Sequence, residues 1–528
     1  MSAVGTVWFF ALVFLICAEV VAREVFSAPI RGIVEMTAYS IVGATFLQLA
    51  NTIVAERMTR ADFLLGFIKR VSPLARNLLE LAISLIGTVT FILMVQSGWP
   101  KFLRAFGDAE IVGIPGEFSF QVWPLRLLRV VGSLVCCAAF AWRVVRTAQQ
   151  IRNEAGARSL IVGAVFLAVV AGAATLAFNA FWDSGPSNLT IGVAMLVVMV
   201  ALVMLGIHIG VSMILVGFLG LWLLKGRIVF AYTMVGLAGN EYLANYFFSA
   251  IPLFVLMGLL VSASDIGRET FIVARWVTRP LLAGLGIATV GANAIFAAIT
   301  GSSIASAAVF AKIATPEMMR HNYTRRFSVG VVAGSSVLGM LIPPSLLLIV
   351  YGFLSEQSVG HLFFAAILPG IALAAVMAMT IWVMARFRPQ WVFSGDATAA
   401  EADADEEMSV ARAAILLAPV MGLIVLVLGG IYGGLYTPTE GGAVGSAGAL
   451  AYALARRRLD FKSLWRVMVE TGQIATTVLF LVLAANVFTR MLASSGLVQA
   501  ISLGIGNLGL DPAAFLLLYV LLLVLLGL

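Results

Sequence analysis

The chain has 528 residues, of which 61% are hydrophobic and only 11% are charged. Because soluble domains carry about 25% charged residues, this composition excludes an ordinary soluble fold and requires lipid. The formal net charge of +7 comes from Arg and Lys placed mainly between apolar segments, which indicates the loops of a membrane protein and not a nucleic-acid-binding surface.

Long apolar segments that rarely alternate with polar residues predict an all-α, polytopic membrane protein and not a β-barrel. The first segment is interpreted as a retained helix, since no small-residue cleavage pattern precedes Arg23. In chain order the apolar segments cover residues 3–22, 33–55, 77–97, 125–145, 159–181, 189–206, 209–224, 247–263, 285–315, 327–353, 362–385, 413–430, 441–455, 474–493 and 513–528.

A short segment between the second and third apolar segments, residues 62–71, predicts a helix that lies in the membrane interface. A solvated cytoplasmic loop is the alternative. The prediction depends on five apolar residues that share one helical face: Phe63, Leu64, Phe67, Ile68 and Val71.

The charged stretches predict the topology. Residues 56–76 and 143–158 hold an excess of Arg and Lys and are expected to be cytoplasmic, which leaves residues 98–124 outside. The segment 159–181 then crosses back, so the next block begins outside. Residues 386–412 are expected to form a flexible, solvated linker, because they carry a run of carboxylates among Ala and Thr: Asp396, Glu401, Asp403, Asp405, Glu406 and Glu407.

A weak internal similarity relates the two sides of this linker. The turn at residues 205–210 has a counterpart at residues 435–441, about 230 residues later, and Asn240 and Glu470 each stand near the start of a following segment. The first turn is expected on the cytoplasmic side. The second is expected outside, because three arginines follow it at residues 456–458. Two similar units of opposite orientation predict an inverted-repeat transporter.

Residues 301–308 (GSSIASAA) interrupt an apolar region that is too long for one span and too short for two spans with a normal loop. A helical hairpin that turns back within the membrane needs Gly and Ser at its tip, and exposed amides and hydroxyls there can hold an ion. Close helix packing through small residues is the alternative.

A second break, residues 339–345 (GMLIPPS), lies in the middle of the apolar run 327–353. Two prolines remove two amide donors and leave carbonyls without partners, which a sodium ion can satisfy at membrane depth. A simple proline kink is the alternative. Two breaks within one repeat favour an ion site.

These residues resemble the tripartite ATP-independent periplasmic (TRAP) transporters. The resemblance rests on GSSIASAA, PEMMRHNY and GMLIPPS between Gly301 and Tyr351, and on GIYGGLYTPTE from Gly430 to Glu440, which are signatures of the large (M-type) membrane subunit. Residues 23–76 are similar to the small (Q-type) subunit, with Glu35 after a Pro-x-x-Gly turn. The resemblance therefore implies a fusion of both subunits.

The resemblance implies a sodium-driven symporter of organic acids, such as C4-dicarboxylates or sialic acid, in a bacterial inner membrane. It also implies an elevator mechanism and a periplasmic substrate-binding protein as partner, with no cofactor besides the coupling sodium ion. The implied domains are a small-subunit-like domain (1–155), a joining transmembrane helix (156–186), repeat 1 of the large subunit (187–388), the acidic linker (389–411) and an incomplete repeat 2 (412–528).

Two groups of residues are carried over from the family signatures. The sodium and substrate site is expected to contain Gly301, Ser302, Ser303, Ser306, Gly339, Ile342, Pro343, Pro344 and Ser345. The signature of the second repeat is Thr437, Pro438, Thr439 and Glu440.

Two departures from the family pattern stand out. His208 occupies a turn position where the family often has proline. By the repeat offset, the second hairpin tip and the second broken helix fall beyond Leu528, at about positions 531 and 573. We therefore expect a C-terminally truncated form.

An enzyme is not expected, because the three histidines (His208, His321 and His361) show no ligand spacing and no phosphate-binding Gly-x4-Gly-Lys-[Ser/Thr] loop occurs. Cys17, Cys136 and Cys137 lie in apolar segments and indicate neither a metal site nor a disulfide. A sodium–dicarboxylate symporter of similar hairpin architecture that needs no binding protein is the alternative transporter, and a non-transporting membrane scaffold is the other alternative.

Overall fold

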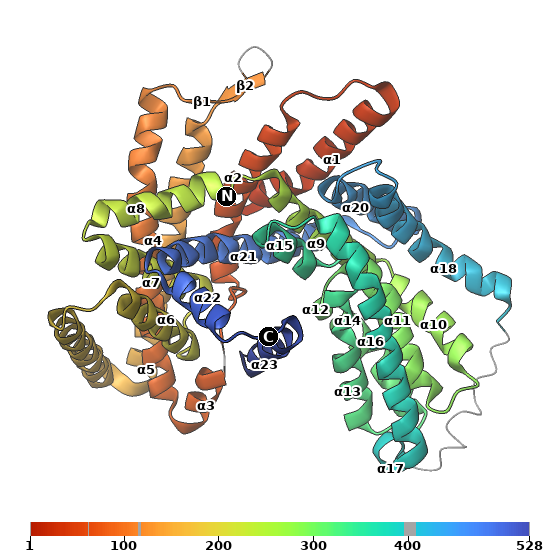
Figure 1. The fold of residues 1–528 in the computed structure, drawn as a ribbon. Coiled ribbons are helices and arrows are strands. Elements are labelled where there is room, and N and C mark those ends of the chain that lie inside the picture. The colour runs from red at the N-terminus through yellow and green to blue at the C-terminus, as the bar shows by residue number, and fades with distance from the viewer. Residues whose placement is uncertain (1, 62, 115–117, 395–407, 527–528) are drawn as a thin grey trace. The chain divides into compact units, whose positions relative to one another are not determined.

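The computed structural model describes residues 2–61, 63–114, 118–394 and 408–526, and that part of the chain is almost entirely helical (Figure 1). The strands among these residues are β1 (Ile111–Ile114) and β2 (Phe118–Gln121), an antiparallel pair in which Val112 is opposite Phe120. The predicted all-α class is therefore confirmed. Most of the predicted acidic linker lies outside the described residues.

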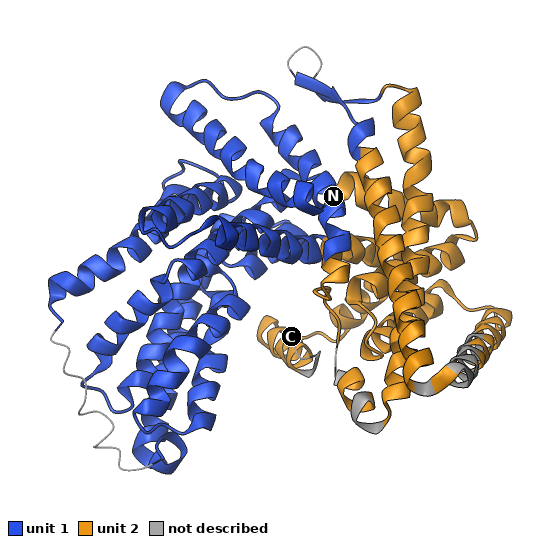
Figure 2. Ribbon diagram, turned by 180° about the vertical axis from the view of Figure 1, so that it is seen from behind, with its two compact units in different colours: residues 1–51, 110–125, 243–479 blue, residues 52–109, 126–242, 480–528 orange. Residues whose placement is uncertain are grey.

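The chain divides into two compact units, each built from separate stretches of sequence (Figure 2). Unit 1 contains residues 1–51, 110–125 and 243–479. Unit 2 contains residues 52–109, 126–242 and 480–528.

Unit 1 holds the two predicted helix breaks. Two of its helices, α9 (Ala250–Ala263) and α20 (Pro438–Ala455), pack extensively against each other. The Ser446 hydroxyl donates to the Leu253 carbonyl at 2.6 Å in this contact. The other helices that lie wholly or mostly in this unit are α1 (Ser2–Phe26), α2 (Ile33–Val54), η2 (Tyr246–Ser249), α10 (Ile266–Thr278), α11 (Gly284–Thr300), α12 (Ser303–Arg320), α13 (Arg325–Ser336), α14 (Leu338–Leu341), α15 (Leu346–Leu354), α16 (Val359–Phe387), α17 (Pro389–Val392), α18 (Val410–Ile424), η3 (Val425–Gly429) and α19 (Gly430–Tyr432).

Unit 2 has an aromatic core in which the Phe91 ring stacks on those of Phe140 and Phe480, each at a centroid distance of 5.7 Å. The last of these residues belongs to α21 (Phe461–Ser494), which continues from unit 1 into unit 2. The remaining helices of unit 2 are α3 (Phe63–Val71), α4 (Pro73–Gly107), α5 (Trp123–Asp183), α6 (Asn188–Met204), α7 (Ile209–Lys225), α8 (Ile228–Leu237), the π-helical turn η1 (Ala238–Tyr242), α22 (Leu497–Asn507) and α23 (Pro512–Leu526).

Two local predictions for unit 2 can be compared with the structure. The helix expected at residues 62–71 is present as α3, where Leu65 is buried and Phe67 is exposed. Its location in the membrane interface stays a prediction. The loop expected at residues 143–158 is wrong as a loop, because α5 continues through it with one break at Gly156, whose φ is +83°. A continuous helix accommodates these charges because other segments pair with them: Arg143 donates to the Glu56 carboxylate and to the Ile53 carbonyl, each at 3.3 Å.

Eight helices in the described part of the chain are long and apolar enough to cross a membrane. A ninth span results if residues 325–354 count as one helix bent by 41° at its break. The apolar segments did not predict α8, α10 and α22, because these helices are short and α10 is amphipathic.

Candidate functional site

The apolar region 285–315 forms the predicted hairpin. Its arms are α11 and α12, and they pack antiparallel, with the Phe296 and Phe310 rings in an edge contact at 5.5 Å. The turn is two residues long. Gly301 ends α11 with a φ of +56°, a left-handed conformation that glycine adopts without steric cost, and Ser302 caps α12 by accepting from the Ala305 amide.

The second predicted break lies between α14 and α15. The helix ends at Ile342, Pro343 and Pro344 form the connection through a cis peptide bond, and a new helix starts after Ser345. Pro343, Pro344 and Ser345 are buried, and the Ser345 hydroxyl donates to the Met340 carbonyl at 2.5 Å. The break therefore uses a buried side chain to satisfy one of its own carbonyls.

The structure brings the two breaks together within unit 1. The Leu346 amide donates to the Gly301 carbonyl at 3.4 Å, which joins the start of α15 to the hairpin tip. A Cβ added at Gly339 would lie 3.0 Å from the Ser302 carbonyl carbon, and one added at Gly301 would lie 2.5 Å from the Pro344 carbonyl oxygen. Both glycines are required by the close approach of backbone to backbone.

Two kinds of helix end meet at this junction. The helices α11 and α14 end there, and their last carbonyls carry the negative end of each helix dipole. The helices α12 and α15 begin there with amides that carry partial positive charge. The junction thus offers carbonyl oxygens suited to a small cation beside amides and hydroxyls suited to an anion.

Ser306 lies apart from the other predicted residues of α12. Its side chain is fully buried between the hairpin arms, where its hydroxyl donates to the Asn293 side-chain oxygen at 2.5 Å. Asn293 is a buried residue that the sequence analysis missed. One feature of the sequence could have predicted its importance: Asn293 is the single amide side chain in an otherwise mainly apolar segment. A buried amide requires hydrogen-bond partners, so such a residue indicates a contact with another helix.

The second-repeat signature forms the start of α20. Thr437 and Glu440 make a reciprocal capping box, in which the Glu440 carboxylate accepts from the Thr437 amide at 2.9 Å. The same carboxylate accepts two hydrogen bonds of 2.9 Å from the guanidinium of Arg23, at the end of α1. Pro438 occupies the first helical position and Thr439 is buried. Glu440 therefore joins the start of α20 to the end of α1 within unit 1.

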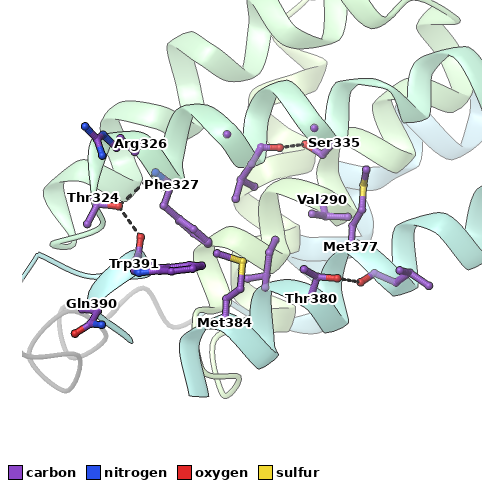
Figure 3. A pocket seen from close by; sticks show the side chains of 15 residues that line it. Val290, Thr324, Arg326, Phe327, Ser335, Met377, Thr380, Met384, Gln390 and Trp391 are labelled. Carbon is purple, nitrogen blue, oxygen red and sulfur yellow. Dashed lines mark hydrogen bonds between the residues drawn. The ribbon is translucent and has the colours of Figure 1, made fainter. Parts of the chain in front are cut away.

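A cavity of about 730 Å³ in unit 1 is lined by residues of α11, α13, α16 and α17 (Figure 3). Its walls are mainly apolar, with Arg326 and Gln390 toward one end and Ser335 toward the other. The residues of the two breaks do not line it. A mostly apolar cavity is a poor site for an organic anion, so the junction is the better candidate.

Two protein families match this chain. The family described as tripartite ATP-independent periplasmic transporter, DctM component, matches residues 196–528, and the DctQ component matches residues 12–150. The chain belongs to the tripartite ATP-independent periplasmic (TRAP) transporter family. It joins the two TRAP membrane components in one polypeptide, as the sequence analysis expected.

Three relatives illustrate the range of TRAP permeases that the chain is similar to. It is 33% identical over 276 residues to a C4-dicarboxylate TRAP transporter large permease protein of Pseudomonas aeruginosa, covering 52% of this chain and 62% of the relative. It is 28% identical over 363 residues to an isethionate TRAP transporter permease protein of Oleidesulfovibrio alaskensis (65% of this chain, 56% of the relative). It is 23% identical over 504 residues to a sialic acid TRAP transporter permease protein of Haemophilus influenzae (93% and 77%).

The chain thus spans less than two thirds of the Pseudomonas and Oleidesulfovibrio relatives. These relatives are named as transporter permease proteins. Membership of the TRAP family, with the long apolar helices, places the chain among multi-pass proteins of the bacterial inner membrane.

Proposed function

We propose that this chain is the membrane permease of a sodium-driven symporter that takes up organic acids delivered by a periplasmic substrate-binding protein. The observation that carries the proposal is the junction at which the hairpin tip meets the broken helix. Breaks of this kind at membrane depth cost free energy in a static scaffold, because each releases backbone groups that lipid cannot satisfy. A transporter uses the same groups to bind its ion and substrate.

The proposed sodium ligands are backbone carbonyls and hydroxyls of Gly301, Ser302, Ser303, Gly339 and the segment Ile342–Ser345. Support comes from the convergence of two helix C-termini there, which supply partial negative charge without a carboxylate. The Ser306 and Ser345 hydroxyls donate to the Asn293 side chain and to the Met340 carbonyl, so we assign them to stabilising the backbone around the site.

The proposed substrate is an organic anion with a carboxylate or sulfonate group. The relatives are named for C4-dicarboxylates, isethionate and sialic acid. The amino ends of α12 and α15, which face the same junction, are suited to such an anionic group. The hairpin and broken helix would then move together across the membrane as an elevator.

Uptake by the full chain in proteoliposomes, with its binding protein added, tests the proposal. We expect uptake to require a sodium gradient and to be unaffected by ATP. Ser303→Phe places a ring in the hairpin tip and is expected to abolish uptake while the protein still inserts. Ile304→Phe is the matched control, because that neighbouring side chain is 80% exposed. Uptake that continues unchanged without sodium would contradict the proposal.

A further inference from the structure

Asn293 is a fully buried amide in the middle of the first hairpin arm, α11. The hydroxyls of the other polar side chains of that helix donate to its own carbonyls: Thr289 to Leu285 at 2.8 Å, and Thr300 to Phe296 at 3.1 Å. The Thr289 hydroxyl has one weaker contact outside the helix, with the Met318 sulfur at 4.0 Å. The Asn293 side chain instead reaches two other helices. This difference indicates a specific function for the amide.

The Asn293 side chain donates through its nitrogen to Ser335 and accepts through its oxygen from Ser306. The Ser335 hydroxyl donates its hydrogen to the Val331 carbonyl at 2.7 Å, so its oxygen accepts from the Asn293 amide nitrogen at 2.5 Å (Figure 3 shows Ser335 and its bond to the backbone). The Ser306 hydroxyl donates to the remaining Asn293 oxygen at 2.5 Å. Because the Ser335 hydrogen is directed to the Val331 carbonyl, its oxygen is left to accept, and the Asn293 amide places its nitrogen toward Ser335 and its oxygen toward Ser306.

This chain of hydrogen bonds joins both hairpin arms, α11 and α12, to α13, the helix that precedes α14 and the proline break. Ser306 lies in the first turn of α12, where its amide donates to the Ser302 carbonyl at 3.2 Å. Ser335 lies in the last turn of α13, a few residues before Gly339 and the proline break. Asn293, Ser306 and Ser335 are each at most 2% exposed. The network therefore connects the hairpin tip to the broken helix through one buried amide.

We propose that Asn293 is a positioning residue for the sodium site: it holds the hairpin tip and the broken helix in the register that brings their carbonyls to one ion. This inference rests on the function proposed above. A sodium ion bound by backbone oxygens depends on their spacing, and neither break has a charged side chain that would hold the ion if the spacing relaxed. A buried polar network of this kind favours the one arrangement of the surrounding helices in which its hydrogen bonds form.

The test compares Asn293→Ala and Ser335→Ala, singly and together, in the full chain. Sodium half-saturation is measured in two ways: by the rise of the thermal midpoint of the purified protein with sodium, and by uptake. We expect Asn293→Ala to raise the sodium concentration at half-saturation about tenfold. One or two buried hydrogen bonds contribute a free energy that corresponds to such a factor. At saturating sodium, the half-saturation for the organic acid is expected to change less than about twofold.

Two further variants separate positioning from general stability. Thr289→Val removes a buried hydroxyl from the same helix, so it is expected to lower the thermal midpoint and leave sodium half-saturation unchanged. The double variant is expected to be no worse than Asn293→Ala, because the two residues share one hydrogen bond. If Asn293→Ala does not fold, Ser335→Ala carries the test, with an expected rise of about threefold.

The outcomes are distinguishable. If the wild type responds to sodium but the variants lose only thermal stability, Asn293 is structural and this inference is overturned while the proposed function stands. If the wild type shows neither sodium stabilisation nor sodium-dependent uptake, both are overturned.

Discussion

The two predicted repeats differ at the segment that follows their first helix pair. In the first repeat this segment is divided into α8, the π-helical turn η1, a short irregular stretch, η2 and α9. In the second repeat the corresponding residues, about 230 positions later, form the single 34-residue helix α21. Neighbouring elements keep the offset: α7 begins at Ile209 and α20 at Pro438, and α10 begins at Ile266 and α22 at Leu497. The same architecture therefore tolerates either a broken or a continuous helix at one position.

The broken version has a buried arginine at its break. Arg129, on α5, is fully buried and donates to the Gly236 carbonyl at 2.9 Å and to the Val235 carbonyl at 3.2 Å, at the end of α8. These carbonyls lie at the negative end of the helix dipole, which favours a cation. In the continuous α21 the hydroxyls of Thr471 and Thr477 donate to carbonyls four residues earlier in their own helix. The break is therefore found where another helix supplies a donor for the carbonyls that it releases.

The largest expected effect comes from removing that partner. Arg129→Met leaves two carbonyls without their donor, and we expect it to destabilise the protein by about 2–5 kcal/mol. The matched control is Arg126→Met, one turn earlier on the same helix, where the side chain is only partly buried and donates to the Lys101 carbonyl. Unfolding in detergent, followed by tryptophan fluorescence, measures both. Equal losses for the two variants would show that the break does not depend on Arg129.

A smaller effect is expected when a methyl group is added at a glycine in each predicted repeat, Gly239 or Gly472. A Cβ at Gly239, in η1, would lie 2.6 Å from the Arg129 guanidinium, which three hydrogen bonds hold in place. Gly239→Ala should therefore cost about 1–3 kcal/mol as overpacking. A Cβ at Gly472, in α21, would lie 2.7 Å from the amide end of Gln48. That is the end of a flexible side chain, so Gly472→Ala is expected to cost less in the same unfolding assay. A larger loss of stability for Gly472→Ala than for Gly239→Ala would contradict the inference that the Arg129 guanidinium is held in place at the break.

The smallest effect concerns the turns that open α7 and α20. In the second repeat Thr437 caps the helix, whereas His208 in the first repeat makes no side-chain cap. Burial, with the nearby Arg143 and Arg60, lowers the pKa of His208 to about 3. An unfolded histidine has a pKa of about 6.5, so protons bind the unfolded state first and stability is lost as pH falls from about 6.5 toward 3.

The His208 contribution can be measured by difference. Between pH 8 and pH 6 the wild type is expected to lose about 0.8 kcal/mol more than His208→Gln, which does not titrate. Thr437→Ala, in the turn without a histidine, should lower stability equally at both pH values. Parallel pH profiles for the wild type and His208→Gln would show that the histidine is hydrated in the folded state.

The sequence determined the parts of this protein that depend on local chemistry. Long apolar segments required membrane helices, the small residues at 301–303 predicted the hairpin turn, and Pro343 with Pro344 predicted the second break. These features could be predicted because lipid leaves the backbone few ways to satisfy its hydrogen bonds. The TRAP signatures identified the family from the same residues.

Only the tertiary structure decided which partners satisfy the groups that the breaks release. No local pattern shows that Asn293 connects Ser306 to Ser335, or that Arg129 meets the end of α8 about a hundred residues later. It also decided that residues 143–155 stay helical and that one repeat is broken where the other is continuous. The physical reason is that a buried polar group is stable only with a partner, and that partner comes from the packing of distant helices.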